Sequence, residues 1–248
     1  DAKDAEYAVN LQQESGKTAT NNTLQFGAES KTSGLIYVGQ NVTNTKIEFA
    51  EGAVFDGQIV VQTKKKGVEG TFLKASGQTF KGQNGAILFY DGTNSKIELT
   101  NVNFVDNTSD YGGAVYTYAA TFEQVGGSYV GNKAVNKSYN GEKNGSIMDG
   151  ALGGALMIKG NDPVVFTDVE FKNNSAVATR EAKIGGYAYG GAIGADYSTG
   201  NNGEEAGTAD LVFNISSGKA MTYAGNTVSS DSTGTYFDTY GYHVPTAP

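Results

Sequence analysis

The chain has 248 residues, of which 38% are hydrophobic and only 18% are charged, with a formal net charge of −8 and no cysteine. The acidic balance argues against nucleic acid as a partner, and the lack of cysteine excludes disulfides, thiolate catalysis and zinc–thiolate sites. The longest apolar run, Ala86 to Tyr90, is far shorter than the ~20 residues of a membrane-spanning helix, so we expect no membrane insertion by this chain itself.

In chain order, a repeat becomes visible from about residue 34, through pairs of segments that lie 50 positions apart. The segment NTKIE at Asn44–Glu48 returns as NSKIE at Asn94–Glu98, and Thr71-Phe72 returns as Thr121-Phe122. The segment LTNVNF at 99–104 reappears as FTDVEF at 166–171, and this longer offset of 67 indicates inserted residues. An internal period of this kind is typical of a solenoid.

Two shorter signatures alternate along the repeat and mark its unit. The first is an aromatic residue followed three positions later by asparagine, at Phe104 and Asn107, Tyr129 and Asn132, Phe171 and Asn174, and Tyr223 and Asn226. The second is Gly-Gly-Ala with an aliphatic residue, at Gly112-Gly113, Gly153-Gly154 and Gly190-Gly191, with a weaker copy at Asn84–Ile87. Aromatic residues at 80, 104 and 129 indicate a unit of about 25 residues.

The sequence of each unit predicts short strands and turns. Ala86–Tyr90, Lys96–Leu99 and Val102–Phe104 are rich in β-branched and aromatic residues, and Gly, Asn, Asp and Thr separate them. Three strands in each unit predict an all-β fold, a right-handed parallel β-helix of roughly eight coils. We expect a single domain over 1–248, with 1–33 as the first coil or an N-terminal cap, 34–226 as the repeat coils, and 227–248 as the last coil and a tail.

Both signatures have a physical role in such a fold. The asparagine is expected to adopt the left-handed conformation of a sharp corner, and its amide is expected to bond to the equivalent asparagines above and below it as a ladder. The aromatic residue is expected to point inward and stack on its copies. The two glycines are expected to lie where the backbone turns tightly or approaches the neighbouring coil, with the aliphatic residue facing the core.

Insertions between the signatures are the candidate binding loops. Those near 133–152 and 175–189 lie at one corner, and a third near 198–209 follows a Gly-Gly-Ala strand and therefore lies at a different corner. In solenoids such insertions gather on one face, which often binds partners. The candidate contact residues in or beside these loops are Tyr139, Tyr187, Tyr189 and Tyr197. The alternative interpretation is that these tyrosines cover the ends of the core.

The paired signatures resemble the repeats of the polymorphic outer membrane proteins of chlamydial type, which belong to the autotransporters. The resemblance covers roughly residues 80–226, and the 50-residue offset extends it back to about residue 34. It implies a surface-displayed passenger of parallel β-helix that acts in adhesion. Phenylalanine is replaced by tyrosine at Tyr129 and Tyr223, which departs from the family pattern.

Catalysis is the main alternative, since pectate lyases and polygalacturonases are also parallel β-helices. Lyases of that fold resemble one another in pairing an arginine base with carboxylate-bound Ca²⁺, whereas this chain has one arginine, Arg180, and one histidine, His243, near its end. We therefore expect no enzyme, no catalytic residue and no cofactor. We also expect no metal, and Asp196, Glu204 and Glu205 form the one candidate Ca²⁺ loop.

The expected function is a surface-displayed or secreted adhesin or passenger domain. It would be extracellular or outer-membrane-associated, and it would bind a glycan or a protein of a host or neighbouring cell through its corner loops. One alternative is an extracellular filament subunit that stacks end to end, because Glu6–Leu11 alternates like a strand and Tyr236–Tyr240 is aromatic. The other is a polysaccharide lyase or hydrolase of the β-helix type.

Overall fold

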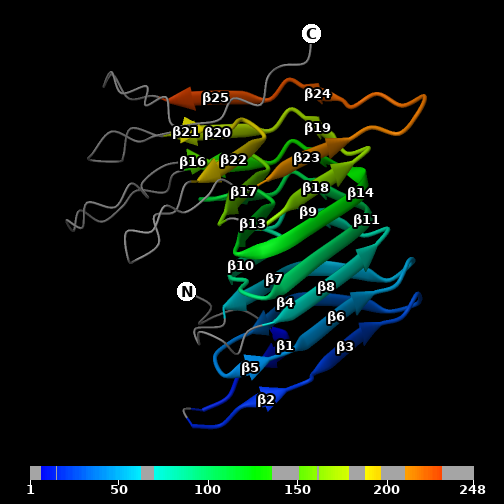
Figure 1. Cartoon of the computed structure of the whole chain (residues 1–248), viewed down its shortest axis with the longest axis vertical. Coiled ribbons are helices and arrows are strands. Elements are labelled where there is room, and N and C mark those ends of the chain that lie inside the picture. The colour runs from blue at the N-terminus through cyan, green and yellow to red at the C-terminus, as the bar shows by residue number, and fades with distance from the viewer. Residues whose placement is uncertain are drawn as a thin grey trace, which may run out of the picture.

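The computed structural model describes residues 7–14, 16–62, 70–135, 151–160, 162–178, 188–196 and 210–230. Within these residues every regular element is a β-strand and none is a helix (Figure 1). Each described strand pair is parallel. The described part of the chain accordingly has no helix of the length and apolarity that crossing a membrane requires. The predicted all-β architecture of parallel strands is confirmed.

The described strands form three large sheets and two small ones. A seven-stranded sheet contains, in spatial order, β1 (Tyr7–Leu11), β4 (Lys31–Val38), β7 (Val54–Gln62), β10 (Ile87–Asp91), β13 (Val115–Tyr118), β17 (Leu156–Lys159) and β22 (Ile193–Asp196). A four-stranded sheet contains β12 (Thr108–Ser109), β15 (Lys133–Val135), β20 (Ser175–Ala178) and β25 (Thr227–Ser230). Two-stranded sheets pair β2 (Ala19–Thr20) with β5 (Val42–Thr43), and β16 (Ala151–Leu152) with β21 (Ala188–Tyr189).

The third large sheet is ten-stranded and faces the seven-stranded one across the core. Its main path is β23 (Leu211–Asn214), β18 (Val164–Thr167), β14 (Ala120–Val130), β11 (Ser95–Val105), β8 (Thr71–Ser76), β6 (Thr45–Phe49) and β3 (Thr23–Phe26). Beside this path, β9 (Thr79–Lys81) pairs with β11, and β19 (Glu170–Lys172) pairs with β14 and β24 (Tyr223–Ala224). Strands of successive coils stack along the long axis of the molecule, from β3 at one end to β24 and β25 at the other (Figure 1). This stacking is the arrangement of a β-solenoid.

Alternation along each strand creates the core. In β6 the buried residues Thr45, Ile47 and Phe49 alternate with the half-buried residues Lys46 and Glu48. One face of the strand therefore points into the core and the other carries charge. The parallel register then places like residues above one another, as where Ile97 of β11 pairs with Phe122 of β14. Because side chains on neighbouring strands share a face, inner residues of successive coils join in one large hydrophobic cluster, and Ala134, Ala151 and Ala176 form a separate small one.

Aromatic rings stack along this core as the first signature predicted. The ring of Phe104 lies 5.3 Å from that of Phe80 and 4.7 Å from that of Tyr129, and both pairs are within about 12° of parallel. Tyr129 and Phe171 are 4.9 Å apart with an interplanar angle of 1°. Phe26 and Phe49 stack in the same way near the N-terminus, at 4.5 Å, although neither lies in an aromatic-x-x-Asn signature. Ring stacking therefore extends beyond the repeats that the sequence revealed.

Tyr129 is a tyrosine in this buried stack because its hydroxyl has a specific acceptor. The hydroxyl donates a 2.8 Å hydrogen bond to Oε1 of Gln124, and both residues are fully buried. The Gln124 amide nitrogen in turn donates to the carbonyl oxygens of Val102 and Gly126 at 3.0 and 3.1 Å. Burial raises the pKa of the Tyr129 phenol well above its usual range, so the group stays a donor.

Replacing Tyr129 with phenylalanine is expected to lower the free energy of unfolding by about 1–3 kcal/mol, because Oε1 of Gln124 would remain buried without its donor. The two hydrogen bonds that the Gln124 side-chain nitrogen donates hold this side chain in the core, so Oε1 cannot turn toward water. Urea denaturation checks this loss. The matched control is Tyr118→Phe on a half-buried tyrosine of β13, which should change stability by less than about 0.5 kcal/mol. Equal losses in the two variants would contradict the expectation.

Candidate functional site

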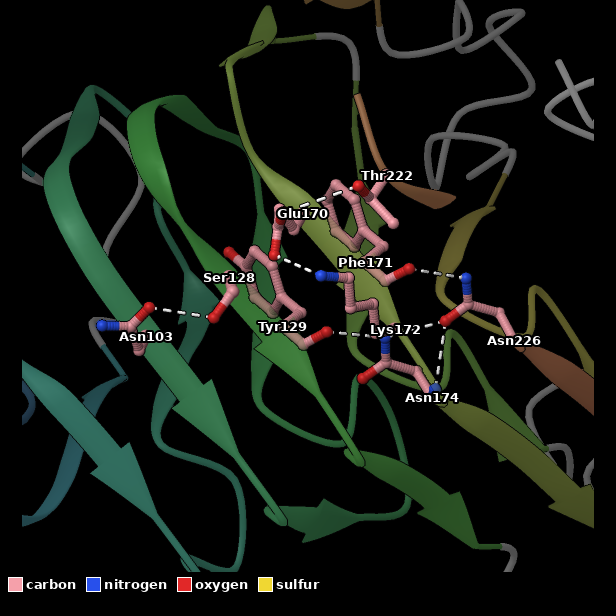
Figure 2. Close-up of polar contacts among 9 residues, drawn as sticks. All are labelled: Asn103, Ser128, Tyr129, Glu170, Phe171, Lys172, Asn174, Thr222 and Asn226. Carbon is pink, nitrogen blue, oxygen red and sulfur yellow. Dashed lines mark hydrogen bonds and ion pairs between the residues drawn. The ribbon is translucent and has the colours of Figure 1, made fainter. Parts of the chain in front are cut away.

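A ladder of asparagine side chains runs along one edge of the core, immediately after the aromatic stack. Nδ2 of Asn107 donates to Oδ1 of Asn132 at 2.9 Å, Asn132 donates to Asn174 at 3.0 Å, and Asn174 donates to Asn226 at 2.9 Å. The partners are 25, 42 and 52 residues apart in sequence, so each rung belongs to a different coil. The amide ladder expected from the first signature is present, and its last rungs are drawn in Figure 2.

Each ladder side chain also makes two hydrogen bonds to the backbone of the preceding coil. Oδ1 of Asn132 accepts the backbone N–H of Asn107 at 3.1 Å, and Nδ2 of Asn132 donates to the carbonyl oxygen of Phe104 at 2.9 Å. The same two contacts recur for Asn174 with Asn132 and Tyr129. Since these asparagines are buried, each amide satisfies backbone groups that no water could reach.

The expectation that these asparagines adopt the left-handed conformation is wrong. The left-handed residue is the one before each asparagine: Asp106 (φ 54°), Gly131 (φ 67°), Asn173 (φ 54°) and Gly225 (φ 66°). The physical reason is that each ladder asparagine directs its amide at the asparagines of the neighbouring coils, and the residue before it makes the corner. Glycine, asparagine and aspartate at that preceding position are the residues that tolerate the conformation best.

The Gly-Gly-Ala signature forms a second corner, at the start of the seven-stranded sheet. Its first glycine is left-handed in each copy, with φ of 58° at Gly112, 64° at Gly153 and 69° at Gly190. Its second glycine lies against the next coil, since a Cβ on Gly154 would overlap the carbonyl oxygen of Gly191 and lie 2.6 Å from the backbone nitrogen of Ser175. Small residues here therefore let successive coils pack closely, as predicted.

The first two insertions leave and re-enter the solenoid at one corner. Val135 at the end of β15 pairs with Val177 in β20, and Ala151 at the start of β16 pairs with Ala188 in β21. The ends of the predicted loops 133–152 and 175–189 are therefore strands, and 136–150 and 179–187 lie outside the described residues. The third insertion, 198–209, lies outside the described residues, and the strand before it, β22, belongs to the seven-stranded sheet.

Most of the candidate contact and metal residues lie outside the described part of the chain. These are Tyr139, Tyr187, Tyr197, Glu204 and Glu205, and the one arginine, Arg180, and the one histidine, His243, lie there as well. For Tyr189 and Asp196 the structure describes only the backbone, at the ends of β21 and β22. Among the described residues no group of three or more His, Cys, Asp or Glu side chains could hold a metal ion.

A tyrosine cluster on the outer face of the seven-stranded sheet was missed by the sequence analysis. The ring of Tyr116 lies 5.3 Å from that of Tyr90 and 6.2 Å from that of Tyr111. Tyr90 is 44% exposed, and partial burial together with the nearby charge of Asp110 raises the pKa of its phenol. The alternation in Ile87–Asp91 placed Tyr90 on the face opposite Ile87 and Phe89 and could have revealed it.

This tyrosine cluster lies beside the corner from which the first insertion returns. Tyr111 forms an isolated parallel bridge with Leu152, the second residue of β16. The rings of Tyr90 and Tyr116 lie on adjacent coils and are tilted by 37° to each other. The cluster therefore places aromatic side chains at the border of the loop corner.

The stacked strands and the two columns of corner residues define an all-β solenoid scaffold with insertions at its corners. Comparison with protein families, with curated proteins and with solved structures finds no match to this chain.

Proposed function

We propose that this chain is a non-enzymatic, surface-displayed or secreted β-helical protein, an adhesin or passenger domain that binds a glycan or a cell-surface protein through its corner loops. The observation that carries the proposal is the pairing of the two insertions. Their bases are held one coil apart by β15 on β20 and by β16 on β21. Two insertions whose bases occupy adjacent positions on one scaffold can contact one ligand together.

The finer description of the fold belongs to the same proposal. It is a right-handed parallel β-helix of roughly eight coils, one domain without catalytic residues or cofactor, which functions outside the cell or at the outer membrane. The resemblance to polymorphic outer membrane protein repeats supports this location and an adhesive role. The residues of the two signatures carry that resemblance, and in this structure they form the ladder and the glycine corner.

Removal of 136–150 and 179–187 together is expected to abolish binding while the thermal transition remains. The chain itself offers a template for the shortened corner, because in the preceding coil the single residue Asp110 joins Ser109 of β12 to Tyr111. Joining Val135 directly to Ala151 therefore rebuilds a corner of nearly native length. Binding is measured on a printed glycan array and on cultured epithelial cells.

The matched control removes 63–69, which connects β7 to β8 at another corner, and should bind like the unaltered chain. Unchanged binding by the double-loop deletion would refute the proposal. A screen for unsaturated or reducing-end products on acidic polysaccharides separates the enzyme alternative, and we expect no turnover there. Product formation by the purified chain would overturn the non-enzymatic assignment.

A further inference from the structure

The corner between β23 and β24 is longer than the same corner in the coil before it. Phe213 pairs with Phe166, and Tyr223 pairs with Phe171, so both ends of the two corners are in register. Five positions separate Phe166 from Phe171, whereas ten separate Phe213 from Tyr223. The later corner therefore carries five additional residues, and all of its residues lie within the described part of the chain.

One carboxylate fastens this longer corner to the coil before it. Oδ1 of Asp168 accepts the backbone N–H of Ser216 at 2.8 Å, and Oδ2 accepts the Ser216 hydroxyl at 2.6 Å. The ammonium group of Lys219 lies 3.2 Å from the same Oδ2. The side chain of Asp168 is 9% exposed, whereas that of Lys219 is 63% exposed. A nearly buried carboxylate therefore receives three polar contacts from one segment of the next coil.

Few other contacts hold this corner in place. Residues 215–220 are all exposed. In the part of the chain that the structure describes, each hydrogen bond or ion pair from 215–220 to another coil ends on Asp168. Within the corner, the backbone N–H of Lys219 donates to the carbonyl oxygen of Ser216 at 3.0 Å and closes a turn. Met221 is the next residue that packs against the core. A segment with so few buried contacts can open without the rest of the fold.

The negative charge of Asp168 strengthens these contacts. Hydrogen bonds to an ionised acceptor are roughly twice as strong as those between neutral groups. The Ser216 hydroxyl, then its backbone N–H, and more weakly Lys219 hold the pKa of this carboxyl below its ordinary value, against the opposing effect of burial. The contacts therefore favour the ionised form, and protonation weakens them.

The other elements beside this corner offer Asp168 no second charge. On β19, Glu170 is paired with Lys172 at 2.7 Å, as Figure 2 shows. β18 and β23 have no titratable side chain, and the β14 residue that pairs with the end of β18 is Val125. Among the described residues, Lys219 is accordingly the charged group that contacts this carboxylate.

We propose that Asp168 and residues 215–220 form an acid-released latch: the ionised carboxylate fastens the corner to the coil before it, and protonation frees the corner while the strands on both sides stay paired. The stability that the latch adds is complete above the ordinary carboxyl pKa of about 3.9, and it is lost as the pH falls through the lower pKa of Asp168 in the folded chain. The corner lies within the ten-stranded sheet, whereas the two insertions follow strands of the four-stranded sheet. The inference is therefore independent of the proposed binding role of the loops.

The test is Asp168→Gly, which removes the carboxylate but suits the left-handed conformation of residue 168 (φ 56°). At about pH 6 the backbone amide of Ser216 should exchange with deuterium roughly tenfold faster or more in this variant. In the unaltered chain, protection of this amide relative to an unstructured peptide at the same pH should fall in acid, and in Asp168→Gly it should not depend on pH. The matched control is Asp106→Gly, at a left-handed corner of another coil (φ 54°), which should change neither result.

Neighbouring amides distinguish release of the corner from unfolding of the whole coil. The N–H of residue 168 donates to the carbonyl oxygen of Asn214 at 3.0 Å, and the N–H of Phe171 donates to that of Thr222 at 2.8 Å. Both amides should keep their protection when that of Ser216 is lost. Unchanged exchange of Ser216 in Asp168→Gly would overturn the latch, and so would a pH dependence that persists in this variant. Loss of protection at all three amides together would overturn the local release.

Discussion

Replacing Asn132 with leucine is expected to lower the free energy of unfolding by about 3–6 kcal/mol. The side chain accepts two hydrogen bonds from Asn107, from its backbone N–H at 3.1 Å and from Nδ2 at 2.9 Å. It also donates to the carbonyl oxygen of Phe104 and to Oδ1 of Asn174. Leucine has a similar size but leaves these buried groups without partners, and each such loss costs about 1–3 kcal/mol.

Chemical denaturation of the Asn132→Leu variant measures this effect. The matched control is Asn214→Leu, because Asn214 is an exposed asparagine whose side chain makes only a 3.5 Å contact with Thr167. That change should be within about 0.5 kcal/mol of neutral. If Asn132→Leu changed the free energy of unfolding as little as the control does, the ladder would not contribute to stability.

A single methyl group at Gly154 is expected to lower the free energy of unfolding by about 3–5 kcal/mol, since it would clash with two backbone segments of the next coil. A Cβ there would overlap the carbonyl oxygen of Gly191 and approach the backbone nitrogen of Ser175 to 2.6 Å. Neither group can rotate away, because both belong to the neighbouring coil. The coils would have to separate at this corner, which also lies next to the hydrogen bonds that the backbone N–H groups of Ala155 and Leu156 donate to the carbonyl oxygen of Ala192.

Thermal unfolding of Gly154→Ala and of a Gly27→Ala control tests this expectation. A Cβ on Gly27 meets no atom within 4 Å, and its φ lies outside the left-handed region, so alanine should be neutral or slightly stabilising there. A Gly154→Ala variant with an unchanged melting temperature would show that the corner can open at no cost and would refute the close-packing role of the second glycine.

The stacked fold could be predicted because its determinants are local and repeated. Phe104 with Asn107, and Tyr129 with Asn132, recur at an interval that only coil-on-coil stacking explains, and the structure places them in one ring stack and one amide ladder. The glycine corner could be predicted for the same reason. A pattern that returns once per coil reports a contact between coils, whatever the rest of the coil contains.

What could not be predicted depends on contacts that occur once. In Asp106-Asn107 either residue suits a corner, and only the direction of the amide decides that Asp106 takes the left-handed conformation. Tyr129 and Tyr223 occupy the same signature position in sequence, yet the ring of Tyr129 is parallel to that of Phe171, whereas the ring of Tyr223 is tilted by 45° to it. The Tyr90 and Tyr116 pair was missed because outer-face residues carry no repeat signature.

The widening spacing of the ladder rungs has a consequence for how such a chain can change over evolutionary time. Asn107 and Asn132 are 25 residues apart, whereas Asn174 and Asn226 are 52 apart, and the amide contact is the same in both. Doubling the length of a flexible connection adds only about 0.6 kcal/mol of closure entropy. A corner that lengthens by a few doublings therefore costs less than the roughly 3–6 kcal/mol expected for one rung, so the scaffold can gain surface segments while its interior stays constant.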